Sequence, residues 1–537
     1  MNYIILVTIA ILYLAQNACP KDVPYEILQD TFIGAIYAHT PVIGSRETGK
    51  IITREQALEA VKPNLAVYEE QTRIAKSQNA DIIVFPEYGL YGFGTTRDSV
   101  VPYMEYIPDP QSESWNPCLD PRQSKPTDNV ILKTLSCIAK NSSIYLVANL
   151  GDYQYCEPAQ DPECPDDKRY QYNTNVVFDP QGALIARYHK QKLFMSEIVR
   201  YDVPTSPEYI TFNTPFGKFG TFVCFDILFK EPAVDLVTEY KVNHILFPTA
   251  WMNVYPFFSA VSFHSAWAYG MGVNFLSANI HRPRNRNVGS GVYGYNGIKE
   301  YTMDHEAPNG ELKLATLESR PSPKTIQHTK LENLGNTSRE FVSDLFGDKF
   351  NFVSLKEYEG TISVCHNAVC CSATYKRTGN SHNELYAIGA FDGLHTKEGT
   401  YYLQICTLLK CATDEPESCG SKVTDSKTIF EHFTLKGNFS TQHIFPMVVL
   451  DKAEPSINDW EYSDGPTLSS NSLQKPLLTA AMFGRWYEMD QLFGQRPKTT
   501  VGVKSPGNSA NDNTSNIKVL LLSFISFFII VQFKCQL

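Results

Sequence analysis

The chain has 537 residues, of which 43% are hydrophobic and 19% are charged. A single hydrophobic core stops growing near roughly 300 residues, so we expect one large and one smaller domain. The net charge of −10 and the lack of a Lys/Arg cluster argue against a nucleic-acid-binding protein, because that function needs a basic face.

The amino-terminal residues 1–18 predict a secretory signal peptide. Residues 4–14 are almost wholly apolar, and the small residues Ala15 and Ala18 follow them. This arrangement is typical of a cleaved signal. The alternative is a membrane anchor, but the apolar run is shorter than the roughly 20 residues that a membrane span needs.

The carboxy-terminal residues 499–537 predict a glycosylphosphatidylinositol (GPI) attachment signal. A polar, small-residue stretch around Asn508 precedes the apolar run 519–531. Small residues, a polar spacer and a hydrophobic tail form such a signal, and Asn508 is the candidate attachment residue. A transmembrane helix is the alternative, and the polar end 534–537 is unusual for a GPI signal. We therefore expect a protein on the extracellular side of the cell membrane, held by a lipid anchor, with a secreted form as a variant.

The 13 cysteines agree with secretion, because disulfides form in oxidising compartments. Apart from Cys19, Cys224 and Cys535, they form an early set of four and a late set of six. Even numbers favour disulfides, whose pairing stays open, and a zinc site in the late set is an alternative that no histidine spacing supports. The two sets are Cys118, Cys137, Cys156 and Cys164, and then Cys365, Cys370, Cys371, Cys406, Cys411 and Cys419.

Sequons for N-glycosylation add to the same expectation. Asn141, Asn336 and Asn438 each precede an X-Ser/Thr pair, and a fourth sequon, at Asn513, lies in the polar spacer. In a secreted chain such sites are surface positions.

In the first half of the chain, short apolar strands alternate with helical stretches. Thr53 with Gln56 resembles a capping box that opens a helix, and Pro63 is expected to kink or restart this helix near Asn64. The alternation predicts a layered α/β domain over residues 30–320. The expected strands span residues 31–37, 82–85, 144–148, 175–178, 183–188, 219–223 and 244–247; the fourth and fifth form a hairpin, and a helix begins near Pro232.

After about residue 320 the helical periodicity fades. Short β-like runs, such as 352–355, 361–364 and 401–405, alternate with turns that are rich in glycine, asparagine and cysteine. This pattern predicts a second, β-rich and disulfide-stapled domain over residues 321–498.

Three polar residues follow predicted strand ends. Glu87 follows the strand 82–85, Lys190 follows the hairpin, and Cys224 follows the strand 219–223. Ligand sites of α/β folds form at the carboxyl ends of strands, so the three could converge. Together they suit an amidase: the thiolate attacks the amide carbonyl, the carboxylate accepts the thiol proton and returns it to the leaving amine, and the ammonium stabilises the oxyanion or donates a proton.

Each of the three residues also has an ordinary explanation. Cys224 alone could be a buried strand cysteine, Glu87 a helix cap, and Lys190 a solvated surface residue. The sequence strings around them carry more information than the single residues do.

These strings resemble the nitrilase, or carbon–nitrogen hydrolase, superfamily. Residues 85–87, 188–194 and 223–226 are similar to its glutamate, lysine and cysteine motifs, in the same order. Residues 186–191, 221–229, 247–253 and 263–268 resemble its vanin and biotinidase branch, whose members are pantetheinases and biotinidases. Over roughly residues 30–500, the resemblance implies an αββα sandwich of the nitrilase type, a β-rich second domain, and neither cofactor nor metal. It also implies glycosylation and a lipid anchor.

Two positions near the lysine need separate interpretation. Lys192 stands where the superfamily often has histidine, and a second lysine could change the pKa of Lys190 and of Cys224. The superfamily also uses a second glutamate near the lysine. Glu197 is the candidate for it and for a substrate contact, and a solvated loop carboxylate is the alternative.

The residues after the strand 244–247 are candidates to line a substrate pocket. Trp251 and Asn253 fall just beyond the expected strand end. For Trp251 the alternative is a core aromatic, because large aromatic side chains are usually buried.

The leading functional hypothesis is an amidohydrolase that cleaves a small-molecule linear amide of a vitamin conjugate, pantetheine or a biotinyl amide, through a cysteine thioester. A catalytically silent cell-surface protein on the same fold is the alternative, and acyl transfer or nitrile hydrolysis could use the same residues. Retention of Glu87, Lys190 and Cys224 together argues against a silent protein. The sequence leaves the oligomeric state open.

Overall fold

The computed structural model describes residues 26–43, 49–120, 129–323, 339–378 and 384–493. These residues belong to one unit, Met1–Gly494, and the other unit, Gln495–Leu537, lies wholly outside the described residues. The expected signal peptide, the GPI signal with Asn508, and the sequons at Asn336 and Asn513 also fall outside them.

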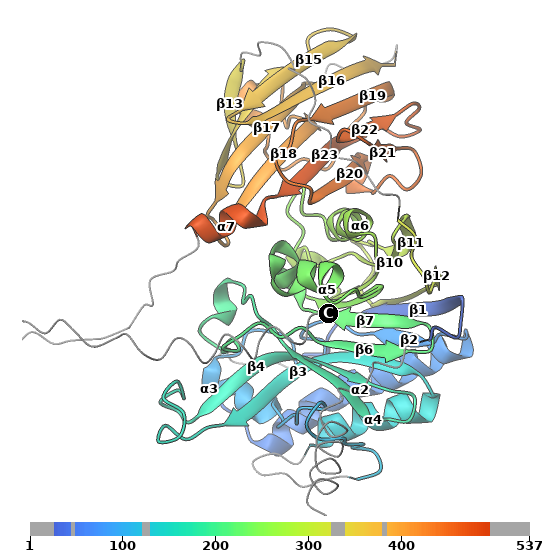
Figure 1. Ribbon diagram of the computed structural model, residues 1–537, viewed down its shortest axis with the longest axis vertical. Coiled ribbons are helices and arrows are strands. Elements are labelled where there is room, and N and C mark those ends of the chain that lie inside the picture. Colours follow the sequence, from blue (N-terminus) through green and yellow to red (C-terminus); the bar gives the residue numbers. More distant parts are fainter. Residues whose placement is uncertain (1–25, 44–48, 121–128, 324–338, 379–383, 494–537) are drawn as a thin grey trace, which may run out of the picture. The chain divides into compact units, whose positions relative to one another are not determined.

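Two six-stranded sheets make up the first half of the described chain (Figure 1). In each sheet the inner strands run parallel, with antiparallel strands toward the edges. The first sheet has the order β12 (Glu311–Glu318), β1 (Thr31–Ala38), β2 (Ile82–Val84), β3 (Tyr145–Tyr155), β4 (Arg169–Phe178), β5 (Leu184–His189). The second has the order β11 (Gly297–Thr302), β10 (Ser290–Gly294), β9 (Asn274–Asn279), β8 (His244–Thr249), β7 (Gly217–Thr221), β6 (Thr211–Thr214).

The two sheets pack face to face, and helices cover their outer faces. A buried apolar layer lies between the sheets, with Phe32 and Val84 from the first and Phe219 and Leu246 from the second. Helices α2 (Arg54–Ser77) and α4 (Val130–Ser142) cover the first sheet, and α6 (Ala260–Met271) covers the second. The result is the predicted αββα sandwich, in which each apolar face is buried against another layer.

The expected strands of this half are confirmed, whereas the predicted restart of the first helix at Pro63 is wrong. Thr53 and Gln56 form the predicted capping box, but Pro63 does not interrupt α2, which continues to Ser77. Pro63 lies on the exposed side of the helix between the exposed Lys62 and the buried Asn64. Water can therefore bind the backbone carbonyl that loses its helical partner, and the packed face of the helix is undisturbed.

The second half is β-rich, as expected, and forms two further sheets that enclose a separate core with Phe433, Leu468 and Ile388. The domain boundaries at residues 320 and 498 stay predictions. One sheet has the order β13 (Phe341–Leu345), β14 (Asp348–Ser354), β17 (Tyr386–His395), β18 (Tyr401–Lys410), β23 (Leu477–Arg485), β20 (Ile444–Leu450). The other has the order β15 (Glu359–His366), β16 (Val369–Arg377), β19 (Phe430–Gly437), β22 (Thr467–Ser470), β21 (Glu461–Ser463). Helix α7 (Tyr487–Phe493) follows β23.

Ten of the described cysteines form five disulfides, and both sets pair internally. The early set contributes two bridges and the late set three, so the β-rich sheets carry more cross-links than the sandwich. Cys224 is the free cysteine of the described residues. The pairs are Cys118–Cys137, Cys156–Cys164, Cys365–Cys370, Cys371–Cys406 and Cys411–Cys419.

The β-rich half packs on the sandwich through a shared apolar core. Trp267 of α6 and Phe483 of β23 belong to one buried cluster that also contains Cys224. Arg485, fully buried at the end of β23, donates from its Nε to the Leu228 carbonyl oxygen at 2.8 Å. Leu228 ends the short 3₁₀ helix η3 (Cys224–Leu228) that begins at the nucleophile candidate. The β-rich half is therefore part of the surroundings of Cys224.

Candidate active site

The three predicted catalytic residues lie just beyond strand ends, and all are buried. Glu87 follows β2, Lys190 follows β5, and Cys224 follows β7 by three residues. The exposed fractions of Glu87 and Lys190 are 1% each, and that of Cys224 is 8%. Ionisable groups at this depth need partners, because burying an unpaired charge is costly.

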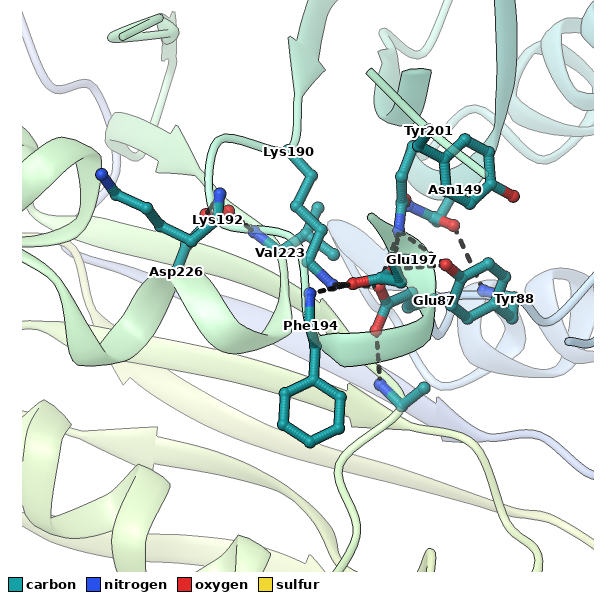
Figure 2. A network of polar contacts seen from close by, with 12 residues as sticks. Glu87, Tyr88, Asn149, Lys190, Lys192, Phe194, Glu197, Tyr201, Val223 and Asp226 are labelled. Atoms are coloured by element: carbon teal, nitrogen blue, oxygen red, sulfur yellow. Dashed lines mark hydrogen bonds and ion pairs between the residues drawn. The ribbon is translucent and has the colours of Figure 1, made fainter. Parts of the chain in front are cut away.

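Lys190 supplies those partners by bridging two carboxylates (Figure 2). Its Nζ donates to Oε1 of Glu87 at 2.7 Å and to Oε2 of Glu197 at 2.7 Å. Glu197 is itself buried, so the alternative of a solvated loop carboxylate is excluded. Two of the three donors of the ammonium are used by these carboxylates, and no described residue is recorded as a partner of the third.

A polar scaffold, which the sequence analysis missed, holds the two carboxylates in place. The Asn173 amide donates to Glu87 at 2.7 Å and to Glu197 at 2.9 Å. The Tyr88 hydroxyl donates to Glu197, and the Asn149 amide donates to the Asn173 side-chain oxygen at 2.7 Å. The sequence does contain a sign of this scaffold: Asn149 and Asn173 are polar residues within β3 and β4. A buried strand usually carries apolar residues at such positions, and a buried amide needs hydrogen-bond partners.

The backbone of Cys224 adopts a conformation that few residues other than glycine adopt. Its φ is +48°, in the left-handed region, at the turn from β7 into η3. Such a turn can present a nucleophile at the end of its strand, as the strained strand-to-helix turn of α/β-hydrolases does.

The environment of Cys224 keeps its thiol protonated. Burial raises the pKa of the thiol, and the charge of Glu87 raises it further, while Lys190 and contacts with Thr249 and Ala250 oppose the shift. The Ala250 N–H also donates to Oε2 of Glu87 at 2.9 Å. Glu87 and Cys224 therefore meet at the same backbone group, and attack by the sulfur requires that a base remove the thiol proton.

The two glutamates differ in their acidity. Burial raises the pKa of Glu87 to about 6, although the Lys190 ammonium opposes this shift. Burial also acts on Glu197, but there Lys190, Tyr88 and the Phe194 N–H together lower the pKa below its usual value. Glu87 thus has an affinity for protons that suits a general base near neutral pH, and Glu197 remains a fixed negative charge.

Lys190 stays charged at neutral pH. Burial lowers its pKa, but the neighbouring charges of Glu197, Glu87 and Cys224 outweigh burial and raise the pKa well above the ordinary value for lysine. This favours the oxyanion-stabilising role over the proton-donor role, because a group with so high a pKa releases its proton reluctantly.

Lys192 does not join this group. Its side chain extends away from the two carboxylates in Figure 2, and its Nζ lies 5.3 Å from the centre of the Phe229 ring. The backbone N–H of Lys192 donates to Asp226 at 2.7 Å. Asp226 also accepts from the Val223 N–H at 2.9 Å, so it ties the lysine segment to the turn that carries Cys224.

Cys224 opens into a cavity of about 150 Å³. Its lining is mainly apolar, and three of the lining residues come from the β-rich half. A cavity with apolar walls and few polar groups is typical of a small-molecule site. The lining residues are Phe194, Met195, Cys224, Phe225, Leu228, Ala250, Trp251, Met252, Val254, Phe258, Phe346, Glu398 and Tyr401.

Comparison with known proteins places this architecture in a family. The carbon–nitrogen hydrolase profile matches residues 51–256, and the vanin C-terminal domain profile matches residues 339–490. Human pantetheinase is 46% identical over 90% of this chain and 93% of its own length. The chain belongs to the vanin branch of the carbon–nitrogen hydrolase family.

Other relatives agree with this assignment. Pantetheinase from Bos taurus is 48% identical over 86% of this chain and 90% of its own length. Biotinidase from Bos taurus is 38% identical over 89% of this chain and 95% of its own length. The chain is accordingly a hydrolase that acts on carbon–nitrogen bonds of linear amides, other than peptide bonds.

The predicted pocket residues of this carbon–nitrogen hydrolase separate into two groups. Trp251 lines the cavity, and its indole N–H is already used by the Phe258 carbonyl at 3.0 Å, so it presents an apolar surface. Asn253 does not line the cavity. Its side-chain oxygen accepts from the Ala260 N–H at 2.8 Å and its amide donates to the Val288 carbonyl at 3.1 Å. The substrate contact expected of Asn253 has no support in this geometry, because both of its polar groups are engaged within the protein.

Glu197 also lies outside the cavity lining, and its contacts are those with Lys190, Asn173, Tyr88 and Phe194. It fits the expected second glutamate of the family rather than a substrate contact. Across the described residues, no group of three or more His, Cys, Asp or Glu side chains is arranged to hold a metal ion.

The structure describes two of the predicted glycosylation sites and the helices that could be tested as membrane spans. The sequon residue Asn141 is exposed, and Asn438 is half-buried. Among the described helices, none is both long enough and apolar enough to cross a membrane.

Proposed function

We propose that this protein hydrolyses pantetheine to pantothenate and cysteamine, with Cys224 as nucleophile, Glu87 as proton acceptor and Lys190 as oxyanion stabiliser. The observation that carries the proposal is the position of Cys224. It is the free cysteine of the described chain, it opens into the cavity, and it shares the Ala250 backbone with a glutamate whose partner is Lys190.

The first half of the reaction forms a thioester. Glu87 accepts the proton of the Cys224 thiol, and the sulfur attacks the amide carbonyl carbon. The resulting oxyanion is stabilised by the third N–H of Lys190 and by a backbone N–H in the first turn of η3, where helical N–H groups lack internal partners. The carbon–nitrogen bond then breaks, and Glu87 returns the proton to the departing amine.

The second half clears the thioester. Glu87 accepts a proton from water, and the hydroxide attacks the thioester carbonyl carbon. The carbon–sulfur bond breaks, and the proton held by Glu87 returns to the Cys224 sulfur, which leaves the acyl group as a carboxylic acid that ionises in solvent. Since Glu87 alternates between two protonation states, the raised pKa of about 6 suits both halves.

The substrate follows from the relatives and from the cavity. Proteins named pantetheinase and biotinidase match this chain over most of its length. A cavity of about 150 Å³ with apolar walls admits a slender acyl arm rather than a folded peptide chain. Pantetheine has the smaller leaving amine, so we place it ahead of a biotinyl amide such as biocytin.

The decisive experiment measures kcat/KM of the purified ectodomain on pantetheine and on biocytin at neutral and mildly acidic pH. We expect one substrate to be preferred by a large factor, with pantetheine as that substrate. Preference for biocytin would redirect the proposal to a biotinidase. Activity on neither, with Cys224 still alkylated by iodoacetamide, would favour the catalytically silent surface protein.

We also propose that the protein acts outside the cell and is held on the membrane by a GPI anchor. Five disulfides support an oxidising compartment, and the small-residue stretch around Asn508 supports the anchor. Phosphatidylinositol-specific phospholipase C should release the protein from intact cells. Retention on the membrane, with the peptide 519–531 detected in the mature protein, would contradict the anchor.

A further inference from the structure

One wall of the cavity comes from the β-rich half and contains a carboxylate. Phe346, Glu398 and Tyr401 line the cavity together with the sandwich residues around Cys224. Glu398 is the one carboxylic acid in the lining, and its side chain is 31% exposed. The catalytic mechanism proposed above gives Glu398 no role.

Glu398 is held by a buried histidine rather than left free to rotate. His395 is 1% exposed, its Nε2 lies 3.2 Å from Oε2 of Glu398, and its Nδ1 lies 2.8 Å from Oδ2 of Asp348. The other oxygen of Glu398, Oε1, has no recorded hydrogen-bond partner in the described part of the chain. Asp348 and Glu398 thus hold the imidazole of His395 between them.

The segment that carries Glu398 is fixed against the nucleophile helix. Gly399 packs so closely on the Phe225 ring that a Cβ added there would lie 3.0 Å from it. The Tyr401 ring stacks on His395 at 4.7 Å, and the Arg485 guanidinium lies 5.0 Å from the centre of the Tyr401 ring. Because Arg485 also donates to the Leu228 carbonyl, Glu398 has a defined position relative to the helix that begins at Cys224.

We propose that Glu398 is a substrate-contacting residue that determines specificity, with Oε1 accepting a hydrogen bond from a hydroxyl on the acyl arm of the substrate. This inference rests on the proposed pantetheine hydrolysis, since the acyl half of pantetheine carries two hydroxyls and its amine half carries none. A carboxylate in an apolar cavity selects hydrogen-bond donors and repels anions, because an unpaired or like charge there is costly. The β-rich half thus supplies recognition to an active site whose chemistry lies in the sandwich.

The first test compares two substrates on two enzymes. Wild type and Glu398→Ala are assayed on pantetheine and on an analogue in which the terminal hydroxyl is replaced by hydrogen. We expect Glu398→Ala to lower kcat/KM for pantetheine roughly 10–100-fold, the loss expected for one hydrogen bond to a charged group. It should change kcat/KM for the deoxy analogue less than about threefold, by the same reasoning. Equal losses on both substrates would overturn the proposal, as would no loss on either.

Glu415→Ala is the matched control. Glu415 is an exposed carboxylate of the same β-rich half that does not line the cavity, so its removal should leave both substrates unaffected. The rate of Cys224 alkylation by iodoacetamide, measured on every variant, shows whether the nucleophile itself has changed.

The second test asks for a gain of activity, which misfolding cannot produce. Glu398→Lys should raise kcat/KM for an analogue that carries a carboxylate in place of the terminal hydroxyl, by about tenfold or more, because attraction replaces repulsion. A fall on both pantetheine and the anionic analogue would overturn the assignment of Glu398. Failure of wild type to hydrolyse pantetheine at all would instead overturn the proposed function, so the two failures are distinguishable.

Discussion

The charged residues near the cavity differ between the sandwich and the β-rich half. On the sandwich side, Glu87, Lys190 and Glu197 are almost fully buried, and each has partners within the protein. On the β-rich side, Glu398 is partly exposed, and the described residues hold one of its two oxygens. Groups that perform chemistry gain from complete preorganisation, whereas a group that recognises a ligand must keep one hydrogen-bonding position open until the ligand arrives. We therefore expect that substitutions can alter reactivity and selectivity separately in this protein.

The largest expected effect is on the sandwich wall. Cys224→Ala should lower kcat by roughly 10⁴-fold or more, because removal of a nucleophile disables both halves of the reaction. The unfolding temperature should stay close to that of wild type, since the thiol has no disulfide partner. Iodoacetamide labelling followed by mass spectrometry should modify Cys224 in the wild type and leave the variant unlabelled at this position. Detection of Cys224 in a disulfide would contradict the mechanism.

Lys190 and Lys192 offer a comparison within three residues of chain. Lys190→Met should cost about 3–4 kcal/mol of transition-state stabilisation, the value of one oxyanion donor, and thus lower kcat roughly 10²–10³-fold. Lys192→Met should change kcat less than about threefold, because the half-buried Lys192 side chain lies over the Phe229 ring, away from Glu87 and Glu197, and a cation–π contact of this kind is worth only about 1 kcal/mol.

The measurement is steady-state kinetics at a temperature at which circular dichroism shows each variant folded. This control matters because the loss of Lys190 leaves two buried carboxylates without their cation, which also destabilises the fold. The reverse pattern, with Lys192→Met crippling and Lys190→Met mild, would show that the lysine motif is misassigned.

The pH dependence follows from Glu87. The base must be ionised to accept the thiol proton, and burial raises its pKa to about 6, so kcat/KM should fall as the pH drops below about 6. The fall should approach tenfold per pH unit. An ordinary glutamate with a pKa near 4.3 would place the fall roughly two units lower. Glu87→Gln is the matched variant, because it keeps the length of the side chain. This variant should lose most of the activity, and the activity that remains should no longer fall at low pH. A profile that stays flat down to pH 5 would contradict the role of Glu87.

The smallest expected effect on kinetics concerns Asn253. Asn253→Ala leaves the buried Ala260 N–H without its partner and removes the shorter of two hydrogen bonds to the Val288 carbonyl, which keeps that from the Asn279 amide. This loss should cost about 1–3 kcal/mol of folding stability. Because Asn253 does not line the cavity, KM should change less than about twofold when the variant is assayed well below its unfolding temperature. Thermal unfolding and KM for pantetheine measure the two effects. A large rise in KM with unchanged stability would restore the substrate contact expected from the sequence.

The sequence predicted the structure best at features that depend on interactions between residues close together in the chain. The capping box of Thr53, the hairpin around residues 179–182 and the strand ends before Glu87 and Cys224 could be predicted because hydrogen bonding and apolar patterning act over a few residues. The same local reasoning wrongly predicted that the helix could restart at Pro63, because the exposed side of a packed helix tolerates a missing hydrogen bond. Tertiary packing, rather than local propensity, decided that helix.

The sequence alone predicted the layered α/β class and the β-rich second half, and it singled out Glu87, Lys190 and Cys224 as candidate catalytic residues. It could not determine which cysteines pair, that Asn173 links two carboxylates, or that Glu398 shares a cavity with Cys224. The last of these depends on segments that are far apart in the chain, since 173 residues lie between Cys224 and Glu398. The packing of the segment before β18 on η3 brings Glu398 to this cavity. Contacts at such sequence separation follow from the complete set of apolar faces and not from any one motif.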